Sequence, residues 1–229
     1  LTKSGFVAVT FTCPQGLVAQ MFSGGLLSGG LGGLFGGSGG IGNLLPLLGG
    51  LLGGSSGGGN FYETVGGPFG QYPAGIISCI NTITTDARFT NIVNAGKIGV
   101  IGHSAGGLGA LIAGSQDSRV KVVVALAPPV HAEALPRPTL FNIPVQIQIG
   151  SKDGMVPLEA VRNYFNSLTA PVKDLVVIEG GNHMQFMDAQ IATLMSTMMS
   201  MFGSSLGIPQ DNPADITAEQ QHSISSSAF

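Results

Sequence analysis

The chain has 229 residues, which suits one α/β domain and suffices to bury a sizeable core. Only 9% of the residues are charged, against about 25% in an average protein, and 44% are hydrophobic, which excludes a charged disordered chain and a coiled coil. The net charge is −3 and the nine basic residues are scattered singly, so we expect no nucleic acid partner.

The chain starts with a β-rich run at residues 5–11 rather than with the basic and apolar regions of a signal peptide. It begins at Leu1 without a methionine, so we expect a processed or truncated start. Two cysteines, Cys13 and Cys79, are too few for a disulfide scaffold and lack the spacing of a metal site. A single disulfide between them stays an open alternative.

Residues 24–60 form a low-complexity insert built almost wholly from Gly, Leu and Ser. Because glycine loses the most backbone entropy on ordering, the leucines must pack against something to hold the insert. Glycines and Pro46 interrupt every apolar run, which disfavours a membrane-spanning helix. We expect a surface lobe with a short helix at residues 44–52. An apolar lid, or an interface for lipid or another subunit, is the alternative.

Strand and helix patterns alternate through the rest of the chain. Further strands are predicted at residues 97–102, 120–126, 145–149 and 175–178, and helices at residues 73–85, 105–114, 158–168 and 185–201. This alternation predicts an α/β fold, a mostly parallel sheet with helices on both faces. We expect one domain over residues 1–203. Residues 204–229 are rich in Ser, Pro, Asn and Gln and are predicted to form an extended tail.

The segment Gly102-His103-Ser104-Ala105-Gly106 fits the pattern Gly-x-Ser-x-Gly and lies between a predicted strand and a predicted helix. A sharp turn there strains the serine and exposes its hydroxyl at the carboxyl edge of the sheet. We expect both flanking glycines to be required, because a Cβ would collide with neighbouring backbone. A helix that begins at Ala105 would direct that residue's backbone N–H toward an oxyanion.

A nucleophilic serine needs a base, and the base needs an orienting carboxylate, in the chain order serine, acid, histidine for this architecture. Asp153 follows the strand at residues 145–149, and His183 follows the strand at residues 175–178. Carboxyl ends of parallel strands meet at one edge of a sheet, so the three side chains are expected together. Ser104, Asp153 and His183 are therefore predicted as a catalytic triad.

Other polar residues compete for these roles. His103 is expected to pack and to form hydrogen bonds with its side chain directed away from Ser104. His131 is interpreted as a loop residue, with a place at the pocket rim as the alternative. His222 falls in the predicted tail. Glu179 is the alternative acid, but it ends a strand directly before the His183 loop, so Asp153 is favoured.

Residues 102–107, the Asp153 turn and the His183 loop resemble those of the α/β-hydrolase superfamily. Within it, the chain resembles serine esterases of the polyester hydrolase, cutinase-like and dienelactone-hydrolase-like group, over roughly residues 1–20 and 73–202. The resemblance implies hydrolysis of a carboxylic ester, including lipid or polymer esters, without a metal or organic cofactor. We expect a secreted or extracellular protein.

The chain departs from this family in two ways. Three family strands precede the one that residues 2–9 resemble, and the loop after the third carries the other oxyanion donor. No segment can be assigned to them, so the second donor is unknown. Either the chain is a fragment, or an upstream segment or a second chain supplies the strands, and a homo-oligomer is a separate open alternative. Polyester hydrolases also carry a tryptophan where this chain has Val130, so the resemblance does not extend to aromatic polyesters.

The sequence therefore predicts a serine ester hydrolase that forms an acyl-enzyme on Ser104. The alternative is a non-catalytic structural or assembly subunit derived from a hydrolase, with residues 24–60 as its contact surface.

Overall fold

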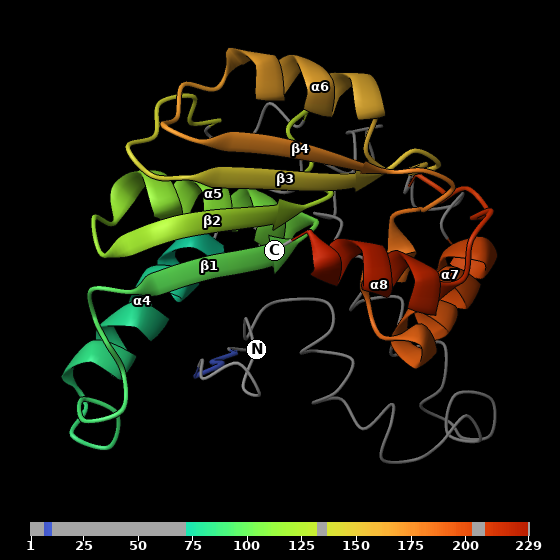
Figure 1. The fold of residues 1–229 in the computed structure, drawn as a ribbon. Coiled ribbons are helices and arrows are strands. Elements are labelled where there is room, and N and C mark those ends of the chain that lie inside the picture. The colour runs from blue at the N-terminus through green and yellow to red at the C-terminus, as the bar shows by residue number, and fades with distance from the viewer. Residues whose placement is uncertain (1–6, 11–71, 132–136, 203–208, 229) are drawn as a thin grey trace, which may run out of the picture.

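The computed structural model describes residues 7–10, 72–131, 137–202 and 209–228. In this part of the chain, four parallel strands form one sheet in the order β1-β2-β3-β4. The strands are β1 (Ile98–His103), β2 (Val120–Leu126), β3 (Val145–Gly150) and β4 (Lys173–Ile178). Their carboxyl ends therefore meet at one edge of the sheet, on the right in Figure 1.

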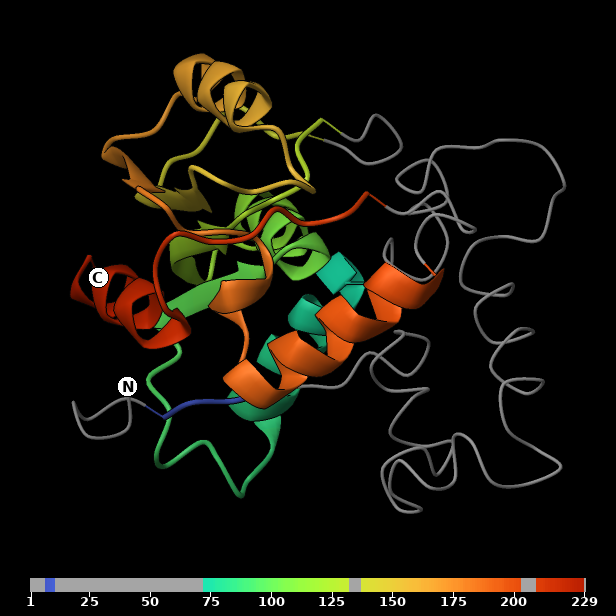
Figure 2. The same cartoon turned by 90° about the vertical axis from the view of Figure 1, so that its right-hand side faces the viewer.

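Helices lie on both faces of the sheet, as Figures 1 and 2 show. α4 (Tyr72–Thr85) and α5 (Ala105–Gln116) cover one face, and α8 (Ala218–Ser227) lies against the other near the carboxyl edge. α6 (Leu158–Ser167) packs on β3, while α7 (Ala189–Phe202) lies beyond the carboxyl edge beside the short 3-10 helix η4 (Met184–Phe186). The predicted α/β fold with a parallel sheet is confirmed.

The core lies between the sheet and helices α4, α5 and α6. β2 reads Val-Lys-Val-Val-Val-Ala-Leu, and its Val120 and Val123 are fully buried against α5, whose Leu108 and Leu111 are also fully buried. Each such aliphatic side chain contributes about 1.5–3 kcal/mol. The turn between β1 and α5 therefore joins two elements that the core holds firmly.

One helix begins later than predicted. The pattern over residues 185–201 suggested a single helix, whereas residues 184–186 form η4 and α7 begins at Ala189. Met187 between them is extended, with ψ 167°, and the Asp188 side chain accepts the backbone N–H of Gln190 at the start of α7. A short side chain that bonds the backbone in this way favours a new helix start.

The strand predicted at residues 5–11 is not formed in the four of its residues that the structure describes. Residues 7–10 have no strand pairing, and Val7 and Val9 are 50% and 42% exposed. Within the described ranges β1 pairs only with β2. No strand in this part of the chain therefore lies on the other side of β1 to which residues 7–10 could pair. The insert at 24–60, its predicted helix at 44–52 and Cys13 lie outside the described residues. Cys79 on α4 is a free thiol whose pKa is raised by burial.

The predicted extended tail is wrong at residues 218–227, which form helix α8. Thr217 and Gln220 form a capping box at the start of this helix. Gln221 is fully buried, and Ser225 donates its hydroxyl to Gln148 Oε1 at 2.6 Å while its carbonyl accepts Gln148 Nε2 at 3.1 Å. Burial of these polar groups is tolerated because each finds a partner.

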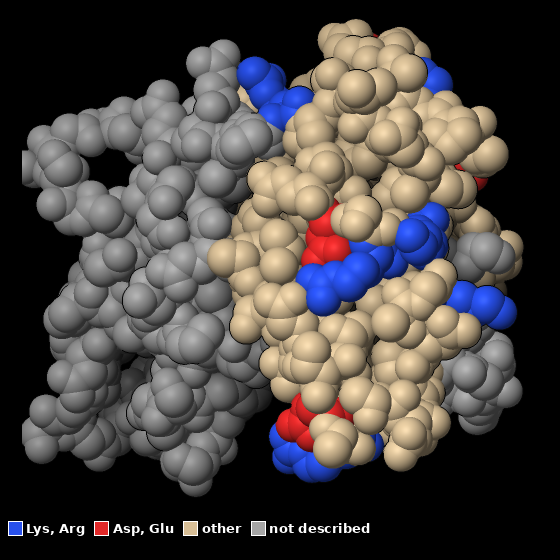
Figure 3. All heavy atoms as spheres, turned by 90° about the vertical axis from the view of Figure 1, so that its left-hand side faces the viewer, with Lys and Arg blue, Asp and Glu red and all other residues tan. Residues whose placement is uncertain are grey.

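The amino ends of the strands form the face in Figure 3, where basic and acidic side chains lie side by side in small groups. Arg119 pairs with Asp117 before β2, and Arg88 pairs with Asp86 after α4. None of the helices in the described ranges combines the length and apolar character needed to cross a bilayer.

Candidate active site

Ser104 occupies the sharp turn between β1 and α5. Its φ of 55° and ψ of −125° are strained for a residue with a side chain, and its backbone N–H donates to Leu126 O at 2.8 Å. A Cβ on Gly102 would lie 2.2 Å from Gly106 O, so only glycine fits there. The strand end and the helix start thus hold the serine at the carboxyl edge of the sheet.

The prediction that a Cβ on Gly106, the second glycine of the motif, would collide with neighbouring backbone is wrong. Apart from its chain neighbours and the backbone of its own helix, no heavy atom of the described residues lies within 4 Å of a Cβ built on Gly106. The tight position is Gly107, where a Cβ would lie 3.0 Å from Gly102 O and 3.1 Å from Leu126 O. The helix therefore approaches the strand at residue 107 rather than at residue 106.

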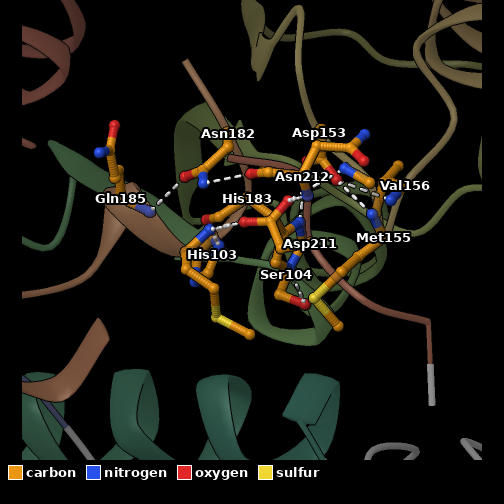
Figure 4. A network of polar contacts seen from close by, with 12 residues as sticks. His103, Ser104, Asp153, Met155, Val156, Asn182, His183, Gln185, Asp211 and Asn212 are labelled. Atoms are coloured by element: carbon orange, nitrogen blue, oxygen red, sulfur yellow. Dashed lines mark hydrogen bonds and ion pairs between the residues drawn. The ribbon is translucent and has the colours of Figure 1, made fainter. Parts of the chain in front are cut away.

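Ser104, His183 and Asp153 form one hydrogen-bonded chain, shown in Figure 4. The Oγ of Ser104 lies 3.0 Å from His183 Nε2, and Nδ1 of His183 lies 2.8 Å from Asp153 Oδ2. A carboxylate only accepts, so Nδ1 carries the proton and Nε2 is left to accept the serine hydroxyl. The side chains of His183 and Asp153 are 2% and 0% exposed.

The turn after β3 orients the carboxylate of Asp153. Its Oδ1 accepts the backbone N–H groups of Met155 at 2.9 Å and Val156 at 2.7 Å, which leaves Oδ2 directed at the imidazole. Glu179, the alternative acid, instead accepts the Ser151 hydroxyl at 3.0 Å. The structure therefore places Asp153, not Glu179, against His183.

His103 packs against the histidine of this chain. Its Nε2 donates to the backbone oxygen of His183 at 3.0 Å, and the two rings lie 4.8 Å apart. Burial holds the pKa of His103 well below its usual range, and the neighbouring His183 lowers it further, so the ring stays neutral. The prediction that His103 packs and forms hydrogen bonds is confirmed.

His131 is partly buried, and burial lowers the pKa of its imidazole. Its interpretation as a loop residue and the alternative of a place at the pocket rim both stay predictions. Val130 before it is 2% exposed and belongs to the core.

Ala105 is the first residue of α5, so its backbone N–H has no acceptor within the helix. This N–H follows the nucleophile directly, where an oxyanion formed on an attacked carbonyl would need a donor. In the described ranges we assign no second donor. No group of three or more His, Cys, Asp or Glu side chains in these ranges is arranged to hold a metal ion.

Residues 209–228 contact the site, a role that the sequence reasoning missed. Asp211 bonds to both loops that carry Asp153 and His183, Asn182 Nδ2 donates to Asn212 O at 2.7 Å, and Gln221 pairs with the backbone of Asn182 at 3.0 and 2.9 Å. His222 on α8 donates to Met187 O at 3.0 Å. The Thr217-x-x-Gln220 capping box was a sequence signal for α8.

Comparisons with known proteins agree with this picture. The sequence matches the family described as PET hydrolase-like over residues 74–204, more than half of the chain. No curated protein is similar enough in sequence to match.

Solved structures with a similar fold include the ferulic acid esterase from Streptomyces cinnamoneus (TM-score 0.53, 22% identity, covering 71% of this chain and 46% of that one). An esterase from Pyrococcus furiosus is also similar (TM-score 0.44, 17% identity, covering 57% of this chain and 62% of that one). So is the dienelactone hydrolase from Anabaena variabilis (TM-score 0.42, 24% identity, covering 59% of this chain and 60% of that one). The chain thus spans about three fifths of the length of the first structures it matches.

Proposed function

Since the chain belongs to the PET hydrolase-like family, we propose that it hydrolyses carboxylic esters through an acyl-enzyme on Ser104. The observation that carries the proposal is the hydrogen-bonded chain from Ser104 Oγ through both nitrogens of His183 to Asp153. Nucleophilic catalysis needs a base that can take the hydroxyl proton of the serine, and His183 Nε2 is placed to accept it.

In the first half of the reaction, His183 Nε2 takes the proton of Ser104 as Oγ attacks the ester carbonyl. Asp153 stabilises the imidazolium that forms, and the Ala105 N–H donates to the oxyanion of the tetrahedral intermediate. The intermediate collapses when His183 gives the proton to the leaving alcohol. In the second half, His183 activates a water molecule that attacks the acyl-serine, and the acid is released.

The proposal extends to carboxylic esters in general and not to aromatic polyesters. At the position where polyester hydrolases are expected to carry a stacking tryptophan, this chain has Val130, which is 2% exposed. A buried aliphatic side chain cannot provide an open aromatic face to a substrate ring. Esters with small or aliphatic acyl groups are therefore the substrates to test first.

Hydrolysis of p-nitrophenyl acetate by Ser104→Ala tests the proposal. Loss of a triad nucleophile commonly lowers turnover about a million-fold, so hydrolysis is expected to vanish with folding unchanged. Ser115→Ala is the matched control, because Ser115 lies exposed on helix α5 and its hydroxyl donates to Ile112 O in its own turn. Hydrolysis by Ser104→Ala at more than a few per cent of the wild-type rate would contradict the assignment.

A non-catalytic assembly role is the second candidate, and the open edge of the sheet favours it. In the described ranges β1 pairs on one side only, and Ile101 on it is 47% exposed. An unpaired strand edge invites pairing with another segment or chain. A folded wild-type protein that hydrolyses no ester would make this the better account.

A further inference from the structure

One carboxylate bonds to both loops that carry the acid and the base. Asp211 Oδ1 accepts the backbone N–H of Gly154 at 3.0 Å, and Oδ2 accepts the backbone N–H of Met184 at 2.8 Å. Gly154 directly follows Asp153, and Met184 directly follows His183. Figure 4 shows Asp211 among these groups, close to the imidazole and the carboxylate that it would align.

We propose that Asp211 is a positioning residue that sets the spacing between Asp153 and His183 by holding the residue next to each of them. This inference rests on the proposed function, in which these two side chains are the acid and the base. Asp211 bonds backbone N–H groups rather than reacting atoms, so it acts through the two loops.

The backbone beside Asp211 supports the same role. A Cβ on Gly154 would lie 2.5 Å from Gln210 O and 2.6 Å from Asn212 N, so this segment rests directly on the backbone of the acid loop. Only glycine allows that approach. The Asp153 turn and residues 210–212 therefore form one packed unit, and a shift of either moves the other.

The segment has independent attachments to the histidine loop. Asn182 Nδ2 donates to Asn212 O at 2.7 Å, and the fully buried Gln221 pairs with the N–H and the carbonyl of Asn182. These bonds do not involve the Asp211 side chain. Its replacement should therefore leave the segment in place while it releases the link between the loops.

The role needs a carboxylate because both loops present N–H donors. An aspartate offers two accepting oxygens, whereas an asparagine of the same shape must turn its NH₂ group toward one of the donors. Asp211→Asn is therefore expected to release either Gly154 or Met184 without changing side-chain volume. A misplacement of about 1 Å can cost about 100-fold in rate, so kcat should fall about 10- to 100-fold with KM near its wild-type value.

Asp215→Asn is the matched control. It removes the same charge from the same segment, but the Asp215 side chain is 62% exposed and forms an ion pair with Lys152 at 3.0 Å. A general effect of charge near the acid loop would appear in both variants. Loss of positioning should appear only in Asp211→Asn.

The decisive readout is the proton NMR signal of His183 Nδ1–H, which reports its bond to Asp153 without any turnover and is identified by its loss in His183→Ala. We expect this downfield signal to shift or broaden in Asp211→Asn and to stay unchanged in Asp215→Asn. Gly154→Ala, which displaces residues 210–212 with Asp211 intact, should repeat the effect of Asp211→Asn.

An Asp211→Asn protein with an unchanged signal and an unchanged kcat would overturn the proposal. So would an Asp211→Asn chain that fails to fold, since Asp211 would then be a structural residue. A wild-type protein that shows the signal but hydrolyses no ester would refute the proposed function alone, because the NMR comparison still decides whether Asp211 aligns the two side chains.

Discussion

The two glycines that flank Ser104 in the motif should respond in opposite ways to the same added methyl group. In Gly102→Ala the new Cβ would lie 2.2 Å from Gly106 O, 2.4 Å from Gly106 C and 2.8 Å from Gly107 N, all backbone atoms. In Gly106→Ala the new Cβ has no heavy atom within 4 Å among the described residues, apart from its chain neighbours and the backbone of its own helix. Comparing the two variants therefore shows whether a glycine is required because a Cβ would collide there or only because it belongs to the Gly-x-Ser-x-Gly motif.

The size of the effect follows from these distances. Cβ atoms essentially never approach other atoms closer than 3.0 Å, so the turn in Gly102→Ala must open by at least 0.8 Å, the difference between 3.0 and 2.2 Å. Overpacking of this kind costs about 1–3 kcal/mol. Because Ser104 lies on the same turn, kcat should also fall about 10- to 100-fold. Gly106→Ala should instead stabilise the helix by about 0.4–1 kcal/mol.

Thermal unfolding and p-nitrophenyl acetate hydrolysis check both variants. In a domain of this size each kcal/mol shifts Tm by about 2–4 °C, so Gly102→Ala should melt several degrees lower while Gly106→Ala melts at or above the wild-type temperature. Full activity in Gly102→Ala would refute the steric argument. An equal loss in both variants would show that the motif is needed for a reason other than the close approach at Gly102.

Two further predictions concern pH. Burial lowers the pKa of His103, so below about pH 6.5 the unfolded chain binds a proton that the folded chain does not, and the free energy of unfolding falls as the pH falls. Urea unfolding from about pH 7 to about pH 5 should therefore show a smaller loss of stability in His103→Gln than in the wild type. An identical loss of stability in both would contradict a neutral buried His103. The hydrogen bond from Arg119 lowers the pKa of Asp117, so its stabilisation is fully present above about pH 3.9 and is lost as the pH falls through the lowered pKa. Asp117→Asn should therefore be less stable than wild type at pH 7 but not at the lowest pH, and a constant difference would count against the ion pair as its cause.

The strands and the meeting of Ser104, Asp153 and His183 could be predicted because they follow strong local patterns. β2 was predicted at residues 120–126 with its observed limits, since a mostly apolar, valine-rich run of that length, interrupted only by Lys121, suits a strand of a parallel sheet. Asp153 and His183 each follow such a strand, so the parallel topology alone brings them to Ser104.

Helix α8 could not be found from hydrophobic periodicity. Its sequence Ala-Glu-Gln-Gln-His-Ser-Ile-Ser-Ser-Ser is mostly polar, and it is held by bonds from Gln221 to Asn182 and from Ser225 to Gln148. Such pairings depend on residues far apart in the sequence. The spare volume beside Gly106 and the contact of Asp211 with two loops are likewise tertiary facts, which no local pattern encodes.

Labelling with a fluorophosphonate tests the central claim most directly, because the reagent reacts with an activated serine whatever the natural ester is. The wild-type protein should take up one equivalent, which peptide mass spectrometry places on Ser104, and the reaction should be strongly slowed in His183→Ala because the base is gone. No labelling of folded wild-type protein, or equal labelling of wild type and His183→Ala, would contradict a serine that His183 and Asp153 activate.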